Sequence, residues 1–360
     1  MKSTNNITTL SDENSATDLN RFGWSSFFSE QLQSKNRDLV PARIVGVRKN
    51  IYLARKGSEE ILATIAGRFF NESENSLPAI GDWVLLRDKV IASILKRKNA
   101  LSRKASGGRS RKDNETHAAE QVIAANLDKV FIVCGLDRDF NIRRIERYLT
   151  LIYNCGIDPV IVLTKADLHE SSNHIVQDVE AVAFGVPVYA VSANDAVAVS
   201  QLANFIPQGQ TVALIGSSGA GKSTLINRLN GEDIQSTGEV GIRVGKGRHT
   251  TTTRDLIVLP SGGMVIDNPG IREIALAIDT VGAESAFPDI EAVSRLCKFA
   301  DCSHTHEPGC RVLEEVSCGK ISMSRLKSFQ KLKSELTYHL QRENKGASRV
   351  EKERWKSVSQ

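Results

Sequence analysis

The residues best suited to chemistry lie between Thr211 and Asn230, in the stretch TVALIGSSGAGKSTLINRLN. Four of them satisfy the phosphate-loop pattern G-x-x-x-x-G-K-[ST], in which glycines let backbone N–H groups turn toward a polyphosphate. A buried strand is expected before the loop, and a helix whose positive end faces the phosphates is expected after it. Lys222 would contact the β- and γ-phosphates, and Ser223 would ligate Mg²⁺. The predicted phosphate contacts are Gly216, Ser217, Ser218, Gly219, Ala220, Gly221, Lys222, Ser223 and Thr224.

A second motif indicates which base the nucleotide carries. The apolar run 159–163 ends at Thr164, Lys165, Ala166 and Asp167, which resemble the guanine-reading [NT]-K-x-D motif of GTPases. The Asp167 carboxylate can accept both N–H donors on one edge of guanine, whereas adenine would leave it unpaired. Ser192 and Ala193, after the next expected strand, are predicted as a further base contact from their position alone.

The order of the motifs is unusual. Asp267 and Gly270 form a D-x-x-G segment, in which Asp267 would hold Mg²⁺ through water and the Gly270 N–H would face the γ-phosphate; a simple turn is the alternative. One threonine of 250–253 is a candidate switch ligand for Mg²⁺, and the sequence does not decide which. The base motifs precede the phosphate loop, whereas ordinary GTPases have the reverse order. The chain therefore reads as a circularly permuted GTPase, because permutation moves only the chain ends.

A cluster of thiols near the C-terminus suggests a metal. Cys297, Cys302, His304 and Cys310 have the spacing C-x₄-C-x-H-x₅-C, which suits one tetrahedral, structural Zn²⁺ with no open position. His306 competes with His304 as the fourth ligand. Unrelated thiols in a reducing compartment are the alternative.

Composition bounds the remaining possibilities. A chain of 360 residues is long enough for two or three domains. No apolar run approaches the ~18 residues of a membrane span, and the polar N-terminus lacks a signal-peptide core, so we expect a cytoplasmic protein without membrane contact. The net charge is +5, and residues 320–360 hold eleven Lys or Arg against four Glu. Together with a basic run at 96–112, this favours a polyanionic partner, although solvated basic segments are common.

The expected elements define a multi-domain architecture. Five short strands between residues 40 and 101 suggest a small β-barrel of the oligonucleotide-binding type (OB-fold), or a purely structural barrel. Later βα units predict a parallel α/β sheet with helices on both faces. We expect a partly disordered N-terminal tail (1–37), the OB-fold barrel (38–105), a linker (106–118), a permuted P-loop GTPase domain (119–278), a small α-helical zinc-binding domain (279–345) and a basic tail (346–360).

These features together resemble the ribosome small subunit-dependent GTPase A family, RsgA. The resemblance covers about residues 38–340. It implies late maturation of the small ribosomal subunit, hydrolysis stimulated by that subunit, and rRNA binding. The matching segments are AANLD (124–128), TKAD (164–167), GSSGAGKST (216–224), GKGRHTTTT (245–253), DNPGIRE (267–273) and CKFADCSHTHEPGC (297–310).

One position departs from the usual GTPase pattern. Ile271 stands where many GTPases have a glutamine that orients the attacking water. His249 is the candidate replacement, a choice that the family resemblance also favours, because histidine can orient water or accept its proton near neutral pH. A loop histidine that contacts RNA is the alternative.

The predicted function is a GTPase that hydrolyses GTP to GDP and phosphate and binds rRNA through the barrel and the basic C-terminal region, as a monomer. One alternative is a GTP-dependent RNA-binding assembly chaperone with incidental hydrolysis. Another is an ATPase or kinase with the same loop, which the TKAD motif disfavours.

Overall fold

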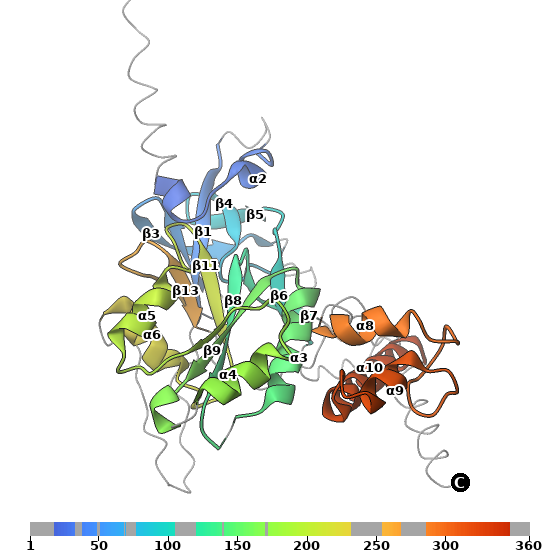
Figure 1. The fold of residues 1–360 in the computed structure, drawn as a ribbon. Coiled ribbons are helices and arrows are strands. Elements are labelled where there is room, and N and C mark those ends of the chain that lie inside the picture. The colour runs from blue at the N-terminus through green and yellow to red at the C-terminus, as the bar shows by residue number, and fades with distance from the viewer. Residues whose placement is uncertain are drawn as a thin grey trace, which may run out of the picture.

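The computed structural model describes residues 18–32, 38–48, 51–67, 69, 77–104, 120–138, 140–169, 172–231, 254–267 and 286–345. Several predicted features lie outside these ranges. They are the linker 106–118, the catalytic candidate His249, the threonines 250–253, Gly270 of the D-x-x-G segment, and the tail 346–360. The described chain forms a barrel, a sheet flanked by helices, and a group of C-terminal helices beside the sheet (Figure 1).

The predicted barrel is present and closed. Antiparallel ladders join β1 to β2, β2 to β3, β4 to β5 and β1 to β4, and a parallel ladder joins β3 to β5. Its interior contains alternate apolar side chains of the strands, among them Ile44, Val84 and Ile91, each at most 1% exposed. The strands are β1 (Val40–Arg48), β2 (Ile51–Lys56), β3 (Glu59–Ile65), β4 (Trp83–Arg87) and β5 (Val90–Ile94).

Residues 18–32 pack on the outside of this barrel. The short helix α2 (Ser26–Ser29) buries Phe28, and the Trp24 ring meets the Trp83 ring edge-on, with centroids 4.7 Å apart. Edge-to-face contacts of this kind add to the burial of the rings. The N-terminal segment is thus part of the folded body from Asp18 to Leu32.

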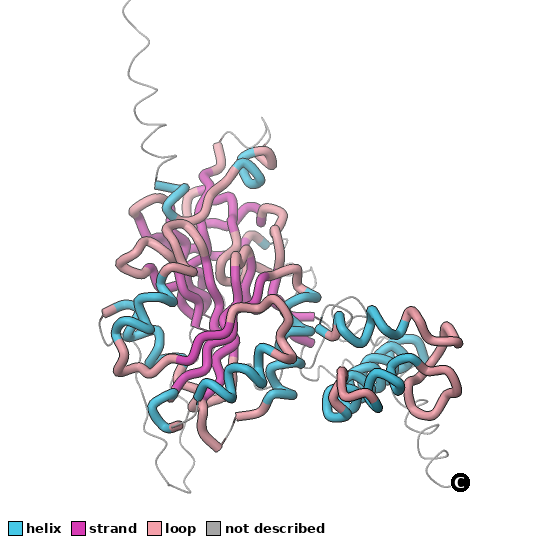
Figure 2. The backbone as a smooth tube through the Cα atoms, viewed as in Figure 1, coloured by secondary structure: helices cyan, strands magenta, loops and turns pink. Residues whose placement is uncertain are grey.

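The central sheet follows the predicted parallel pattern. Strands β8 (Lys129–Gly135), β9 (Asp158–Thr164), β10 (Val188–Ala190), β11 (Thr211–Ile215) and β13 (Met264–Asp267) are parallel in the order β10-β9-β8-β11-β13. Successive residues of β8 point to opposite faces, so Ile132 and Phe131 belong to different cores. The helices α3 (Ile142–Asn154) and α4 (Ser172–Glu180) cover one face, and α5 (Ala196–Ala203) and α6 (Lys222–Asn230) cover the other (Figures 1 and 2).

Two pairings were not predicted. Strand β12 (Arg254–Val258) runs antiparallel to β13 because the chain turns back at 259–263, where the Leu259 N–H bonds the Gly263 carbonyl at 2.8 Å. The other edge of β12 pairs with β1, which joins the sheet to the barrel. Strand β6 (Ala100–Lys104) lies within the range expected for the barrel, yet it pairs with β7 (Glu120–Ala125). Strands with long-range partners carry no local signal of their pairing, so periodicity alone does not identify these ladders.

A buried arginine also connects the barrel with the sheet. Arg43 of β1 is 1% exposed, and its guanidinium donates to the Thr211 hydroxyl at 2.8 Å, to the Asn126 carbonyl at 3.2 Å and to the Phe22 carbonyl. Burial lowers the pKa of Arg43 to about 10, so it remains charged at neutral pH. Thr211 opens the strand that leads into the phosphate loop, and the barrel therefore directly contacts that strand.

The C-terminal helices are α8 (Pro288–Ser294), α9 (Arg311–Ser317) and α10 (Met323–Lys345), which gather around Phe287, Val312 and Phe329. Arg325 of α10 reaches back to the sheet domain, where it donates to Glu146 of α3 at 3.3 Å. Within the described ranges, no helix combines the length and the apolar character that a membrane span requires.

Candidate nucleotide site and metal cluster

The loop 216–221 follows β11 and leads into α6, as the pattern predicted. Gly216 has a φ of 152°, and a Cβ there would lie 2.1 Å from the Val133 carbonyl oxygen, so no other residue fits without displacing β8. Gly221, with a φ of 88°, caps the start of α6. These two glycines shape the turn that points the loop N–H groups inward, and the N-terminus of α6 adds its partial positive charge there.

Lys222 and Asp267 place a cation and a carboxylate beside this loop. The Lys222 Nζ donates to the Gly216 and Ser217 carbonyls at 2.8 and 2.6 Å, so the ammonium folds back across the loop. Asp267 ends β13, which pairs with β11 so that Asp267 lies opposite Leu214. Burial raises the pKa of Asp267, while the positive charge of Lys222 acts in the opposite direction. The predicted phosphate and magnesium ligands therefore share one edge of the sheet.

Thr164 joins the base motif to the phosphate loop. Its hydroxyl donates to the Ala220 carbonyl at 2.6 Å, although the two residues are 56 positions apart in the chain. The side chain is 6% exposed, so the bond is shielded from water. The motifs that appear in reversed order in the sequence thus meet in space.

The rest of the base segment is held by a partner that the sequence analysis missed. Lys165, at a φ of 60°, places its Nζ 2.5 Å from the Asp137 Oδ2. Asp137 follows the end of β8, and its position one strand away from TKAD is the only signal that sequence reasoning could have used. The Ala166 N–H bonds the Val191 carbonyl at 3.2 Å, which brings Ser192 and Ala193 beside the first base segment. Asp167 lies on the short helix η4 (Ala166–Leu168) and is exposed, as a residue that meets a ligand must be.

The four predicted metal ligands are gathered in one place. The donor atoms of Cys297, Cys302, His304 and Cys310 all lie within 4.8 Å of one another. The Cys297 and Cys310 sulfurs are 3.9 Å apart, and the His304 Nδ1 lies 3.7 and 3.4 Å from them. Ligands about 2.3 Å from a tetrahedral Zn²⁺ are about 3.8 Å apart, so this donor set fits such an ion. The cluster could hold a metal ion.

The structure also distinguishes between the two histidines. His304 is 2% exposed and its carbonyl accepts a 2.6 Å bond from Gln330 of α10, whereas His306 is exposed and its ring contacts the Thr305 hydroxyl. His304, at a φ of 57°, has the left-handed backbone that turns its ring toward the sulfurs. Burial raises the pKa of Cys302 to about 11, so without a cation this thiol keeps its proton at neutral pH.

Comparison with known proteins identifies the family. The family model described as RsgA GTPase matches residues 94–277. The small ribosomal subunit biogenesis GTPase RsgA of Opitutus terrae is 40% identical over 360 residues, an alignment that covers 95% of this chain and 96% of the relative. The chain belongs to the RsgA GTPase family. It is accordingly a GTP-hydrolysing enzyme.

Solved structures support the RsgA fold. YjeQ from Thermotoga maritima is 26% identical, with a TM-score of 0.60 over 83% of this chain and 99% of that one. The structure of YloQ, described as a circularly permuted GTPase, is 23% identical, with a TM-score of 0.57 over 85% of this chain and 98% of that one. The permuted architecture predicted from motif order is therefore confirmed.

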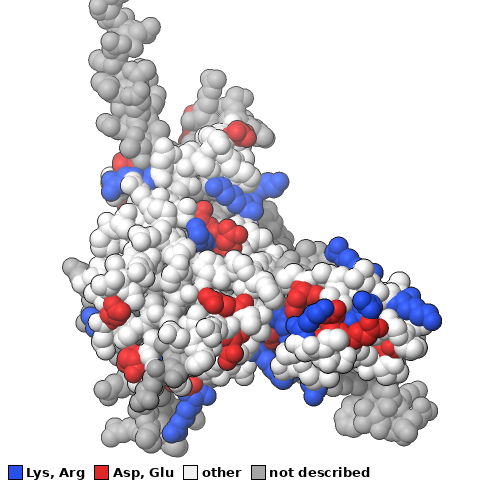
Figure 3. All heavy atoms as spheres, viewed as in Figure 1, with Lys and Arg blue, Asp and Glu red and all other residues white. Residues whose placement is uncertain are grey.

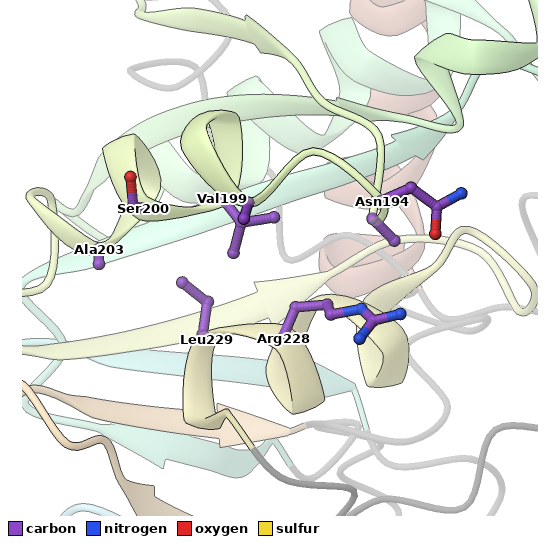
Figure 4. Close-up of a pocket in the computed structure, with 8 residues that line it drawn as sticks. Asn194, Val199, Ser200, Ala203, Arg228 and Leu229 are labelled. Atoms are coloured by element: carbon purple, nitrogen blue, oxygen red, sulfur yellow. The ribbon is translucent and has the colours of Figure 1, made fainter.

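A cavity of about 390 Å³ lies between α5 and α6 of this RsgA chain, beside the base segment (Figure 4). Asn194 and Arg228 lie at one end of it, and Val199 and Leu229 form its apolar part. Of the predicted nucleotide contacts within the described chain, only Ala193 lines it. The cavity flanks the base segment and is separate from the phosphate loop.

The basic run at 96–112 includes a residue with an internal role. The Arg97 guanidinium makes two 2.8 Å bonds to the carboxylate of Asp82, which is fully buried. The Lys98 ammonium lies 5.2 Å from the centre of the Phe28 ring. These two cations thus stabilise the barrel and its N-terminal cover. Residues 105–112 lie outside the described chain.

Proposed function

We propose that this RsgA-family chain hydrolyses GTP during maturation of the small ribosomal subunit, as the name of its Opitutus relative states for that protein. The observation that supports a single nucleotide site is the bond from the Thr164 hydroxyl to the Ala220 carbonyl. Because that bond joins the guanine-reading segment to the phosphate loop, one nucleotide can contact both.

The proposed roles follow from this arrangement. Thr164 to Asp167 would bind guanine together with Ser192 and Ala193, and residues 216–224 would bind the phosphates. Lys222 would leave the loop carbonyls for the β- and γ-phosphates, and the Gly270 N–H would face the γ-phosphate. Ser223 and Asp267 would hold Mg²⁺, which neutralises charge on the transferring phosphoryl group when bound. The contact of Lys165 with Asp137 would hold the lysine stem along the base.

The attacking water needs its own ligand. Ile271 is apolar and cannot orient it, so we propose His249 for this role, with the imidazole positioning the water or accepting its proton. Subunit binding would complete this arrangement, which accounts for stimulated turnover.

The remaining proposals concern zinc, RNA and the domains. One structural Zn²⁺ would occupy the cysteine–histidine cluster, and rRNA would contact the barrel and the basic C-terminal region. The proposed units are the OB-fold barrel (38–105), the permuted GTPase domain (119–278) and the zinc-binding domain (279–345), in a monomeric cytoplasmic protein. GTP would order the switch segments and set the zinc-binding domain against RNA, and hydrolysis would release it.

The decisive experiment measures GTP hydrolysis with and without purified small ribosomal subunits. Strong stimulation is expected from the wild type, and none from Lys222→Ala, which controls for contaminating GTPases. Unchanged turnover with tight GTP-dependent subunit binding would support an assembly chaperone instead. Competition by excess ATP would contradict the guanine assignment.

A further inference from the structure

A groove of about 310 Å³ lies between α3 of the GTPase domain and the C-terminal helices. Four of the side chains that line it are cationic, namely Arg143, Arg144 and Arg147 of α3 and Lys331 of α10. In Figure 3, Lys and Arg side chains gather where the C-terminal helices meet the GTPase domain, beside a group of Asp and Glu side chains. The groove is thus a shared surface of two domains.

The positive charge of the groove exceeds its negative charge. Glu146 is the one carboxylate among the described residues that line it, and it is 4% exposed. Its Oε1 already accepts a bond from the buried Arg325 at 3.3 Å. Burial raises the pKa of Glu146, so this carboxyl is less readily charged than a surface one. Arg143 and Lys331 are exposed to solvent on either side of it.

The position of the arginines within α3 indicates that an anion is expected. All three lie in the first six residues of the helix, and its first turn contains no acidic residue. Cations are unfavourable at this end because the helix dipole is positive there. An anion in the groove would relieve both this unfavourable term and the repulsion among the arginines.

The two walls are held in register by Arg325. Its guanidinium bonds Asp289 at 2.6 and 2.7 Å within the C-terminal helices, and Glu146 and the Val182 carbonyl at 3.3 and 3.1 Å within the GTPase domain. The side chain is 5% exposed. The groove therefore depends on the docking of these helices against α3.

We propose that this groove binds the sugar-phosphate backbone of RNA, so that cations from both domains hold one RNA segment. Arginine and lysine bind phosphate oxygens without reading sequence. The apolar wall offers no stacking surface for a base, because Phe287 and Leu332 are 1% and 4% exposed. Arg143 and Arg147 lie about 6 Å apart along the helix axis, so the wall presents a row of charges, which suits a polymer better than a single phosphate. The proposal rests on the proposed ribosomal function.

The test measures binding of the full-length, zinc-loaded protein to purified small ribosomal subunits, with a non-hydrolysable GTP analogue, from 50 to 200 mM salt. The variant Arg143→Gln/Lys331→Gln removes one charge from each wall. The matched control Arg311→Gln/Lys320→Gln removes the same charge from exposed positions that do not line the groove. Each lost phosphate contact lowers the salt slope by about 0.7–0.9. The fourfold salt increase should therefore weaken wild-type binding about 8-fold more than binding of the groove variant.

The outcomes separate the inference from the function on which it depends. If the groove variant loses affinity and salt slope while the control does not, the groove is an RNA site. If the wild type binds but both variants behave alike, the groove inference is wrong and the ribosomal function stands. If the wild type does not bind subunits, the proposed function itself fails. If inorganic phosphate or free GDP at millimolar concentration protects α3 from arginine-specific modification as well as subunits do, the groove is a small-anion site and the RNA assignment is wrong.

Discussion

Replacing Arg325 with methionine should destabilise the junction between the GTPase domain and the C-terminal helices. Methionine has a similar length, so the main loss is the guanidinium, which makes two bonds to Asp289, one to Glu146 and two to the carbonyls of Val182 and Ala286. Breaking a buried pair by removing one partner costs about 3–5 kcal/mol, because the other charge remains buried without compensation. We expect a loss of this size in the free energy of unfolding at pH 7.5.

The pH dependence of this loss has a definite sign. Burial already raises the pKa of Glu146 above its ordinary 4.5, and Arg325 is one of the groups that lower it. Without Arg325 the pKa rises further. A carboxyl whose pKa is raised by folding destabilises the folded state when it is charged, so the penalty is absent below pH 4.5 and grows as the pH rises toward the folded pKa. The deficit of Arg325→Met should therefore be smaller at pH 5.5 than at pH 7.5.

The assay is urea unfolding followed by far-ultraviolet circular dichroism at both pH values, with each variant compared with the wild type so that shared effects cancel. Lys327→Met is the matched control, because it makes a similar change at an exposed position of the same helix and should cost less than about 0.5 kcal/mol. Adding Glu146→Gln to Arg325→Met removes the stranded charge, and should recover much of the stability and abolish the pH dependence. A deficit below 1 kcal/mol, or one that does not change with pH, would refute the reasoning.

Three further predictions concern the nucleotide and metal sites. Thr164→Val keeps the side-chain shape but leaves the Ala220 carbonyl without its donor, at a cost of about 1–3 kcal/mol, so GTP affinity measured by calorimetry should fall about tenfold while Thr164→Ser stays near wild type. His249→Ala should slow subunit-stimulated hydrolysis by about 100-fold or more with little change in GTP affinity, and equal losses of both would argue against a catalytic role. Metal analysis should find one zinc per chain, and much less in Cys310→Ser. Because the metal-free Cys302 thiol is protonated, with a pKa of about 11, zinc binding should release protons and strengthen as the pH rises, and calorimetry in two buffers of different ionisation enthalpy would reveal proton uptake if this is wrong.

The motifs and the fold class could be predicted from the sequence because their signals are local. The phosphate-loop glycines are needed for a particular backbone shape, and Gly216 indeed lies where any Cβ would overlap the Val133 carbonyl. The apolar runs of β8, β9 and β11 are typical of strands buried on both faces. Since parallel strands align their carboxyl ends, the motifs at 164 and 216 were expected to meet, whatever their order along the chain.

Other features depend on contacts between distant segments, and the sequence contains no local sign of them. Charge count placed Arg97 in a nucleic-acid-facing run, but burial of Asp82 makes it an internal partner. The spacing of ligands left His304 and His306 as equal candidates, and only the folded loop turns one ring toward the sulfurs. The groove between α3 and α10 likewise exists because Arg325 reaches across 179 residues of sequence to Glu146. Backbone preferences and motif spacing act over a few residues, whereas the partner of a buried charge is decided by which surfaces the completed fold brings together.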